Sequence, residues 1–133
     1  MDNPNKTKLL CPELSYQITG ILFKVHNALG NRYHEKYYQR AVALELTKRN
    51  IPFKQELTVP LTYQGESIGR YVLDFLIDNR LAGELKAIPR LLPKDFAQVR
   101  AYLKAKKLEL GLLTNFRATR LNIHRILYPK QSD

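Results

Sequence analysis

Residues 71–86 read YVLDFLIDNRLAGELK, and this stretch decides the fold. Two apolar runs lie on either side of the polar segment 78–80, a composition typical of a short turn between two strands. If these three residues form the loop, Ile77 lies opposite Leu81 in an antiparallel pair. The stretch therefore predicts a β-hairpin with a defined register.

Counting outward from the turn places Asp74 directly opposite Glu84, and alternation along the strand puts Lys86 on the same face as Glu84. Like charges that face each other in a sheet are unfavourable unless something neutralises them, and a divalent cation does so. Mg²⁺ takes oxygen ligands from one or two carboxylates, waters and phosphates. The patch therefore predicts a metal site in which Lys86 orients a water molecule, helps to deprotonate it, or offsets charge on a phosphate.

An ordinary strand with surface charges is the alternative interpretation, because charged side chains also protect sheet edges from aggregation. The residues around Asp74 and Glu84 are mostly apolar, which suggests strands buried on both faces. A buried acid needs a partner. Although such partners can be purely structural ion pairs, the pattern favours a functional site.

Periodicity on either side of the hairpin completes one domain. In chain order, we expect helices over 13–29 and 34–49, strands over 53–63, 68–77 and 81–87, a helix from Pro93 to the cationic residues 104–107, and strands over 110–113 and about 121–127. Pro60 favours a sheet edge for the first strand of a three-stranded meander. The order α-α-β-β-β-α-β-β predicts an α/β (α+β mixed) fold, with a polar segment 1–12, a single domain over 13–128 and a short tail, 129–133.

Composition limits the possible partners. The chain has 133 residues, with 22 Lys and Arg against 12 Asp and Glu and a formal net charge of +10. This excess favours a polyanionic partner such as nucleic acid, although a generally basic surface that aids solubility is also compatible. The single Cys11 excludes an internal disulfide and offers no zinc-type spacing. Because no signal-like segment and no run of 18 apolar residues occurs, we expect a cytoplasmic protein without a membrane partner.

At this point the sequence resembles a known family. Asp74 followed by Glu84-Leu85-Lys86 is similar to the D…(D/E)XK signature of the PD-(D/E)XK nuclease superfamily. More narrowly, residues 30–38 (GNRYHEKYY), with 41–46 (AVALEL) and 111–116 (GLLTNF), resemble the bacterial GxxExxY proteins. The likeness covers about Ile18 to Leu127. It implies a restriction-endonuclease-like core with a central mixed sheet flanked by helices.

The resemblance also implies roles for particular residues. Asp74 and Glu84 would be metal ligands for Mg²⁺ or Mn²⁺, Lys86 would be the catalytic lysine, and Glu35 would be an additional acid from the preceding helix. Other matches are Gly30, Glu35 and Tyr38, in the motif of the family name, and Gln98 and Tyr102, in the Gln-x-x-x-Tyr motif of RecB-like exonucleases. One departure is Arg32, which stands where the family name has its glycine, two residues after Gly30.

Elementary physics supports some of these roles more than others. Glu35 begins the apolar stripe of its helix and so points toward the sheet, but the helix dipole favours an acid in the first turn in any case. Gln98 and Tyr102 lie four residues apart on one helix face, separate from the apolar Val99 and Leu103, and could line a groove. Without the motif, packing is the simpler role for Tyr102.

Three functions are compatible with these observations. The first is a metal-dependent nuclease that acts on DNA, and the second is a non-catalytic nucleic-acid-binding or regulatory module that keeps the same fold. The third is a protein-interaction domain whose basic face binds an acidic partner. The facing carboxylates favour the first. The choice between DNA and RNA, between exonuclease and endonuclease, and the oligomeric state stay open.

Overall fold

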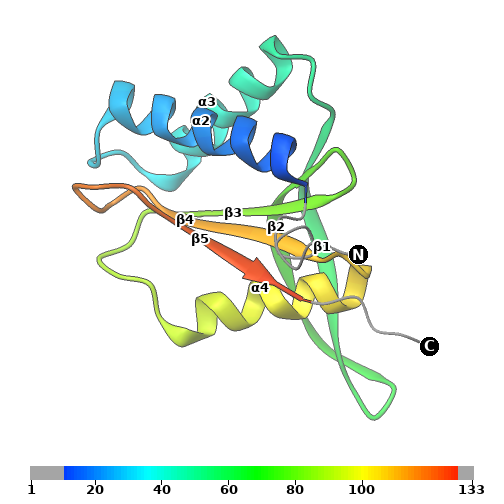
Figure 1. Ribbon diagram of the computed structural model, residues 1–133. Helices are drawn as coiled ribbons and strands as arrows, with labels where there is room; N and C mark the ends of the chain where they lie inside the picture. Colours follow the sequence, from blue (N-terminus) through cyan, green and yellow to red (C-terminus); the bar gives the residue numbers. More distant parts are fainter. Residues whose placement is uncertain (1–10, 129–133) are drawn as a thin grey trace, which may run out of the picture.

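The computed structural model describes residues 11–128, and its elements follow the expected order (Figure 1). They are α2 (Pro12–Leu29), α3 (Glu35–Lys48), β1 (Phe53–Tyr63), β2 (Glu66–Ile77), β3 (Leu81–Lys86), α4 (Pro93–Lys106), β4 (Leu110–Asn115) and β5 (Asn122–Leu127). The predicted tail and most of the predicted N-terminal segment lie outside the described residues. No helix between residues 11 and 128 is long and apolar enough to cross a membrane.

The five strands form one mixed sheet in the order β1-β2-β3-β4-β5. β1, β2 and β3 pair antiparallel as the predicted meander, and β5 is antiparallel to β4. β3 and β4 are parallel, because α4 carries the chain back to the end of the sheet at which β3 begins. β1 is an edge strand, which confirms the position predicted from Pro60.

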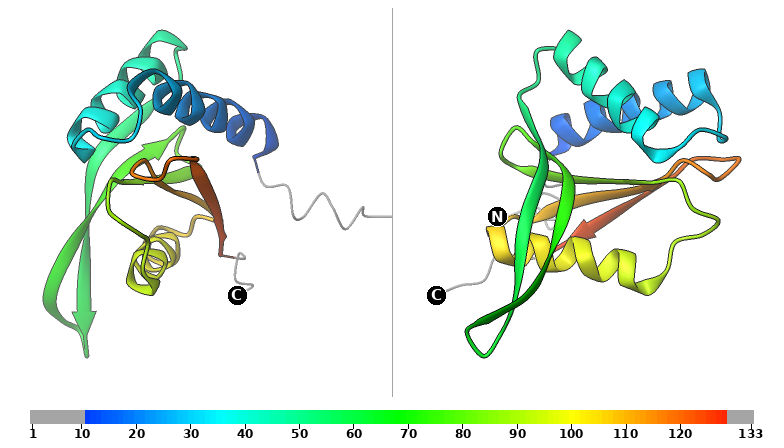
Figure 2. Two further views of the ribbon diagram at one scale, coloured as in Figure 1. Left: turned by 90° about the vertical axis from the view of Figure 1, so that its left-hand side faces the viewer. Right: turned by 180° about the vertical axis from the view of Figure 1, so that it is seen from behind.

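Helices cover both faces of the sheet. α2 and α3 lie on one face and α4 on the other, as all three views show (Figures 1 and 2). Each face has its own buried cluster. The cluster under α2 and α3 contains Ile18, Ile21, Tyr38, Leu46 and Phe116, among others. The cluster under α4 contains Val99, Tyr102, Leu103 and Leu113 together with residues of the other strands. The predicted central sheet flanked by helices is therefore confirmed.

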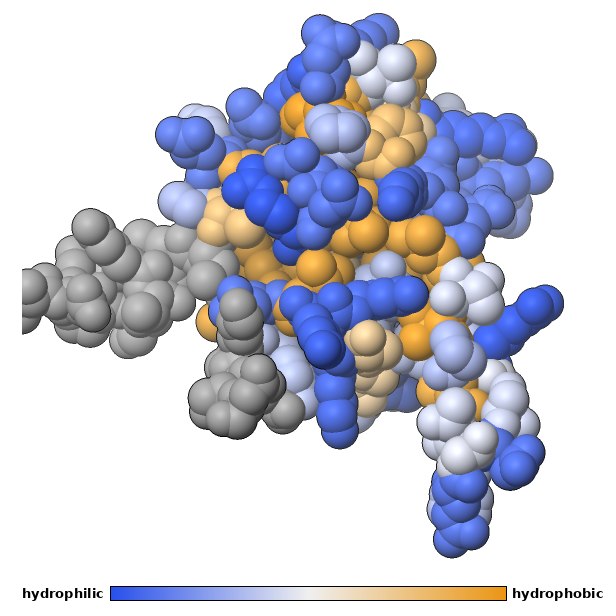
Figure 3. All heavy atoms as spheres, turned by 90° about the vertical axis from the view of Figure 1, so that its right-hand side faces the viewer, coloured by the Kyte–Doolittle hydropathy of each residue, from blue (hydrophilic) through white to orange (hydrophobic). Residues whose placement is uncertain are grey.

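The hairpin of β1 and β2 is longer than the rest of the sheet. β2 pairs with β1 out to Tyr63↔Glu66, but its ladder with β3 spans only residues 75–77. The outer part, residues 60–70, therefore projects from the body as an arm, which is visible in Figure 2 and at the lower right of Figure 3. β3 is buried on both faces as predicted. For β2 that prediction is wrong along the outer half, because only β1 lies beside it there.

Candidate functional site

The two predicted acids meet where β2 and β3 separate. The ladder ends at Phe75↔Gly83, and Asp74 and Glu84 occupy the next position on each strand. Asp74 N–H donates to Glu84 Oε1 at 3.1 Å, and Leu85 N–H donates to Asp74 Oδ2 at 2.8 Å. Each carboxylate thus accepts a hydrogen bond from a backbone N–H that the separating strands leave without a ladder partner. The predicted register, with Ile77 opposite Leu81, is confirmed.

Lys86 completes the predicted patch. Its Nζ lies 3.7 Å from Glu84 Oε2, and its side chain is 20% exposed against 7% for that of Glu84. Lys86 is the last residue of β3, and its carbonyl oxygen accepts a hydrogen bond of 2.8 Å from Phe116 N–H. The lysine therefore stands between the buried acids and solvent, at the carboxyl ends of the parallel strands β3 and β4.

Helix α3 adds two side chains to this site. Gln39 Nε2 donates to Glu35 Oε2 at 3.1 Å and to Asp74 Oδ1 at 3.0 Å. A single amide group therefore joins Glu35, the predicted third acid, to Asp74 of the sheet. Gln39 was not among the residues predicted from the sequence. The available signal was its i+4 spacing from Glu35, which places both side chains on one helix face.

Burial shapes the protonation of all three acids. Burial, followed by the repulsion of Asp74, raises the pKa of Glu84 to about 8, although Lys86 opposes the shift. Burial also raises the pKa of Asp74, against the lowering effect of hydrogen bonds from its neighbours. The pKa of Glu35 is raised by burial and by Asp74 and lowered by Lys86. Burial therefore favours the protonated form of all three acids, and a positive charge that joins the site would favour their ionised forms.

The donor chemistry of this site fits a hard divalent cation. Carboxylate oxygens are the ligands that Mg²⁺ and Mn²⁺ prefer, and Asp74, Glu84 and Glu35 supply them from three different elements. Between residues 11 and 128, no three His, Cys, Asp or Glu side chains are gathered closely enough to form a ligand cluster. The oxygens of Asp74, Glu84 and Glu35 instead contact Gln39, Lys86 and backbone N–H groups. An amide, an ammonium group and backbone N–H groups are therefore the present partners of these carboxylates.

The structure does not join Gln98 and Tyr102 to the acids. Tyr102 is fully buried in the same cluster as Val99 and Leu103, so the predicted separation of its face from the apolar face is wrong. Its hydroxyl makes no hydrogen bond within the described part of the chain. Burial, followed by the proximity of Tyr71, raises the pKa of Tyr102. Gln98 is half-buried on the same helix.

Gly30 and Tyr38 shape the loop that leads to Glu35. The Tyr38 hydroxyl donates to Gly30 O at 2.6 Å and accepts from Tyr33 N–H at 3.2 Å. Its ring stacks on Phe116, with centroids 4.4 Å apart. Gly30 ends α2 with φ 78, a left-handed conformation that favours glycine. These two motif residues therefore hold the start of α3 against the end of β4.

Asn115 is a further residue that the sequence analysis did not single out. Its Nδ2 donates to Ile88 O at 2.8 Å, and its Oδ1 accepts from the N–H groups of Ile88 at 3.1 Å and Arg117 at 3.2 Å. Asn115 is only 6% exposed. It fastens the loop after Lys86 to the end of β4. The available signals were its place in the 111–116 segment quoted above and its position as a polar residue at the end of a largely apolar central strand.

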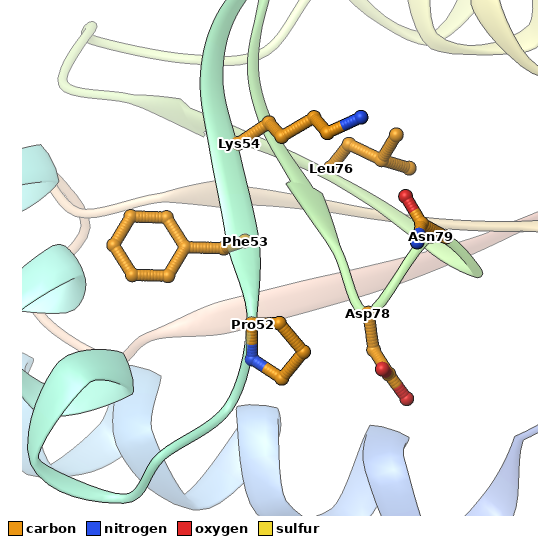
Figure 4. A pocket seen from close by; sticks show the side chains of 6 residues that line it. All are labelled: Pro52, Phe53, Lys54, Leu76, Asp78 and Asn79. Carbon is orange, nitrogen blue, oxygen red and sulfur yellow. The ribbon is translucent and has the colours of Figure 1, made fainter.

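A hollow at the opposite end of β3 has a different character. It has a volume of about 80 Å³ and lies beside the turn between β2 and β3 (Figure 4). Its lining consists of Pro52, Phe53, Lys54, Leu76, Asp78 and Asn79. One exposed acid and one lysine offer no set of converging ligands, so this hollow is not a candidate site.

Comparisons with known proteins agree with this geometry. Residues 12–126 match the family model described as PD-(D/E)XK nuclease superfamily. No curated protein sequence matches the chain. A solved structure described as "Crystal structure of SSO0001" is similar with a TM-score of 0.54 and 19% identity, over 71% of this chain. The match covers 50% of that longer protein, and at this identity it shows the fold alone. The narrower resemblance to GxxExxY proteins stays a prediction.

Proposed function

Because the chain belongs to the PD-(D/E)XK nuclease superfamily, we propose that it is a divalent-metal-dependent nuclease that hydrolyses phosphodiester bonds in DNA. The observation that supports this proposal is a pair of hydrogen bonds between β2 and β3, in which each carboxylate, Asp74 and Glu84, accepts from a backbone N–H of the other strand. Lys86 lies beside Glu84. Two carboxylates and one ammonium group thus lie where β2 and β3 separate, which we call the open end of β3. The net charge of +10 suits a polyanionic substrate.

Each residue has a role in this proposal. Asp74, Glu84 and Glu35 would hold Mg²⁺ or Mn²⁺, and Gln39 would orient Asp74 and Glu35 toward each other. When bound, such an ion supplies charge stabilisation on the phosphate and lowers the pKa of a bound water. Lys86 Nζ would orient that water or offset the negative charge of the phosphate. Because burial raises the pKa of all three acids, a cation that binds them would displace protons and would bind more weakly at low pH.

Cleavage assays with matched variants test this function. DNA is incubated with Mg²⁺, with Mn²⁺ or with a chelator, using the wild type, Asp74→Ala and Lys86→Ala. We expect metal-dependent cleavage that falls by about 100-fold or more in both variants. The exposed pair at the other end of β3 supplies the controls, Asp78→Ala and Arg80→Ala, which should cleave like the wild type. Cleavage without metal, or cleavage that survives in both site variants, would contradict the proposal.

A non-catalytic nucleic-acid-binding module is the second candidate. It is supported by the carboxylate oxygens, which already contact Gln39, Lys86 and backbone N–H groups. This candidate predicts salt-sensitive binding of nucleic acid with no cleavage under any metal condition. The same assay, combined with a binding measurement, therefore separates the two functions.

A further inference from the structure

Two exposed tyrosines stand at the start of α3, next to the acids. Tyr33 is 50% exposed and Tyr37 is 41% exposed, although large aromatic side chains normally lie at least partly in the core. Their rings meet edge to face, with centroids 6.1 Å apart and an angle of 74° between the planes. The two rings therefore present an aromatic surface to solvent without filling any core position.

Two cations lie over the Tyr37 ring. Lys36 Nζ lies 5.2 Å and Arg40 Cζ 5.7 Å from the centre of the Tyr37 ring. Arg32 is exposed in the loop beside Tyr33. Across the described chain, ion pairs involve other cations than these three. We call Arg32, Tyr33, Lys36, Tyr37 and Arg40 the tyrosine patch. Its charge is complementary to phosphate, and its rings suit the flat face of a base.

The patch is continuous with the candidate site. Glu35 lies between its two tyrosines in the sequence and reaches Asp74 through the shared amide of Gln39. On the other side, Asn31 Nδ2 donates to Arg117 O at 3.1 Å. The turn that contains Arg117 lies beside the loop before α3 in every ribbon view (Figures 1 and 2). The exposed Arg117 and Arg120 therefore extend the basic surface along the same edge.

We propose that the tyrosine patch binds unpaired bases of single-stranded nucleic acid and guides that strand to the acids. This inference deepens the proposed nuclease function and rests on it. In a duplex the base faces are stacked on one another, so exposed rings gain contact only with single strands or splayed ends. Cations alone bind single strands and duplexes through phosphates. The combination of solvent-exposed rings and neighbouring cations is what selects the single strand.

Binding measurements without cleavage test the proposal. Fluorescence anisotropy follows a labelled single-stranded DNA oligonucleotide and the duplex of the same sequence, with chelator present. The Tyr33→Ala/Tyr37→Ala double variant should bind the single strand about 10- to 100-fold more weakly. Its affinity for the duplex should change by less than about threefold, because the cations remain. Tyr33→Phe/Tyr37→Phe keeps both rings and should bind like the wild type.

An exposed tyrosine elsewhere supplies the matched control. Tyr16 is 81% exposed on α2, so Tyr16→Ala should leave both affinities unchanged. Equal losses for single strand and duplex in the double alanine variant would overturn the proposal, as would an unchanged single-strand affinity. A loss in the phenylalanine variant would also overturn it, because hydroxyl contacts and not stacking would then carry binding.

Failure of this inference is distinguishable from failure of the nuclease function. If the wild type cleaves DNA but the alanine variant keeps its single-strand affinity, the patch proposal alone falls. If the wild type never cleaves but the alanine variant loses single-strand binding, the patch proposal stands for a binding module.

Discussion

The two ends of β3 place the same kinds of residue in different surroundings. At the turn end, Arg80 lies 2.8 Å from Asp78, and both side chains are more than a third exposed. At the open end, Lys86 lies 3.7 Å from Glu84, whose side chain is 7% exposed. Water screens the first pair, so it contributes little to stability. The second pair lies with Asp74 in a buried site, where an ionised carboxylate costs free energy and burial therefore favours the protonated form.

The largest expected difference between the two ends is in the pH dependence of stability. The Glu84 carboxyl keeps its proton up to a pKa of about 8 in the folded chain, whereas the unfolded chain releases it near 4.5. Between these values the folded state binds more protons, so stability falls as pH rises. In chelator, we expect the wild type to lose on the order of a few kcal/mol between pH 5 and pH 9.

Urea unfolding at several pH values measures this loss. Glu84→Gln should be more stable than the wild type at pH 9 and should show a flatter profile. At the turn end, Asp78→Asn should follow the wild-type profile. If Glu84→Gln loses stability in parallel with the wild type, Glu84 is not the group that titrates.

A smaller effect is expected from the amide that joins helix to sheet. Gln39→Ala removes the donor shared by Glu35 and Asp74, so we expect a loss of about 1–2 kcal/mol at pH 8 in chelator. Gln17 on α2 supplies the control, because it is exposed near the turn end and Gln17→Ala removes a solvated amide. Equal stability of Gln39→Ala and Gln17→Ala would mean that the shared hydrogen bonds contribute nothing.

Sequence reasoning succeeded where local rules decide the geometry. A three-residue turn and two apolar runs were enough to set the register, and the register brings Asp74 and Glu84 together. It failed where the result depends on how a helix packs on the sheet. Gln39 is one of several polar residues on α3, and its contact with Asp74 depends on the orientation of that helix.

The position of Tyr102 shows the same limit. Its i+4 spacing from Gln98 predicted a shared polar face, but the sheet lies against Tyr102 together with Val99 and Leu103. Charge alone carries no position. The cationic residues 104–107 that end the predicted helix lie near the turn end, where Lys107 lines a hollow with Asn79 and Arg80. Nothing in the sequence was a reason to prefer Arg40, which lies over the Tyr37 ring, to any of them.

Salt dependence of DNA binding compares the cations of the two ends. Arg40→Ser, in the tyrosine patch, should reduce the slope of log affinity against log salt concentration by about 1, as expected for one lost phosphate contact. Lys106→Ser, at the far end of α4, should leave the slope unchanged. The measurement is anisotropy over a series of NaCl concentrations. Equal slopes for the two variants would show that nucleic acid does not prefer the open end.

The smallest expected effect concerns the backbone opposite Asp74. Glu56 has φ 55 in the middle of β1. The pairs on either side of it, Gln55↔Phe75 and Leu57↔Leu73, place Glu56 opposite Asp74. At the turn end, Asn79 has the same φ of 55, but there a turn accounts for it. Glu56 is exposed, so no side-chain packing explains its left-handed conformation. Such strain in a strand costs about 1 kcal/mol or more and often marks a functional position.

Substitutions at Glu56 separate strain from side-chain chemistry. Glu56→Gly should change the free energy of unfolding by less than about 1 kcal/mol, because relief of strain offsets the greater freedom of glycine in the unfolded chain. Glu56→Val should lose about 1 kcal/mol or more, since a β-branched side chain disfavours this φ. If the kink positions Asp74, the valine variant should also bind Mn²⁺ more weakly in calorimetric titrations, while the glycine variant binds as the wild type does. A valine variant as stable as the wild type would mean that Glu56 is not strained in solution. The positions of Asp74 and Glu84 would then depend on the separation of β2 from β3 alone.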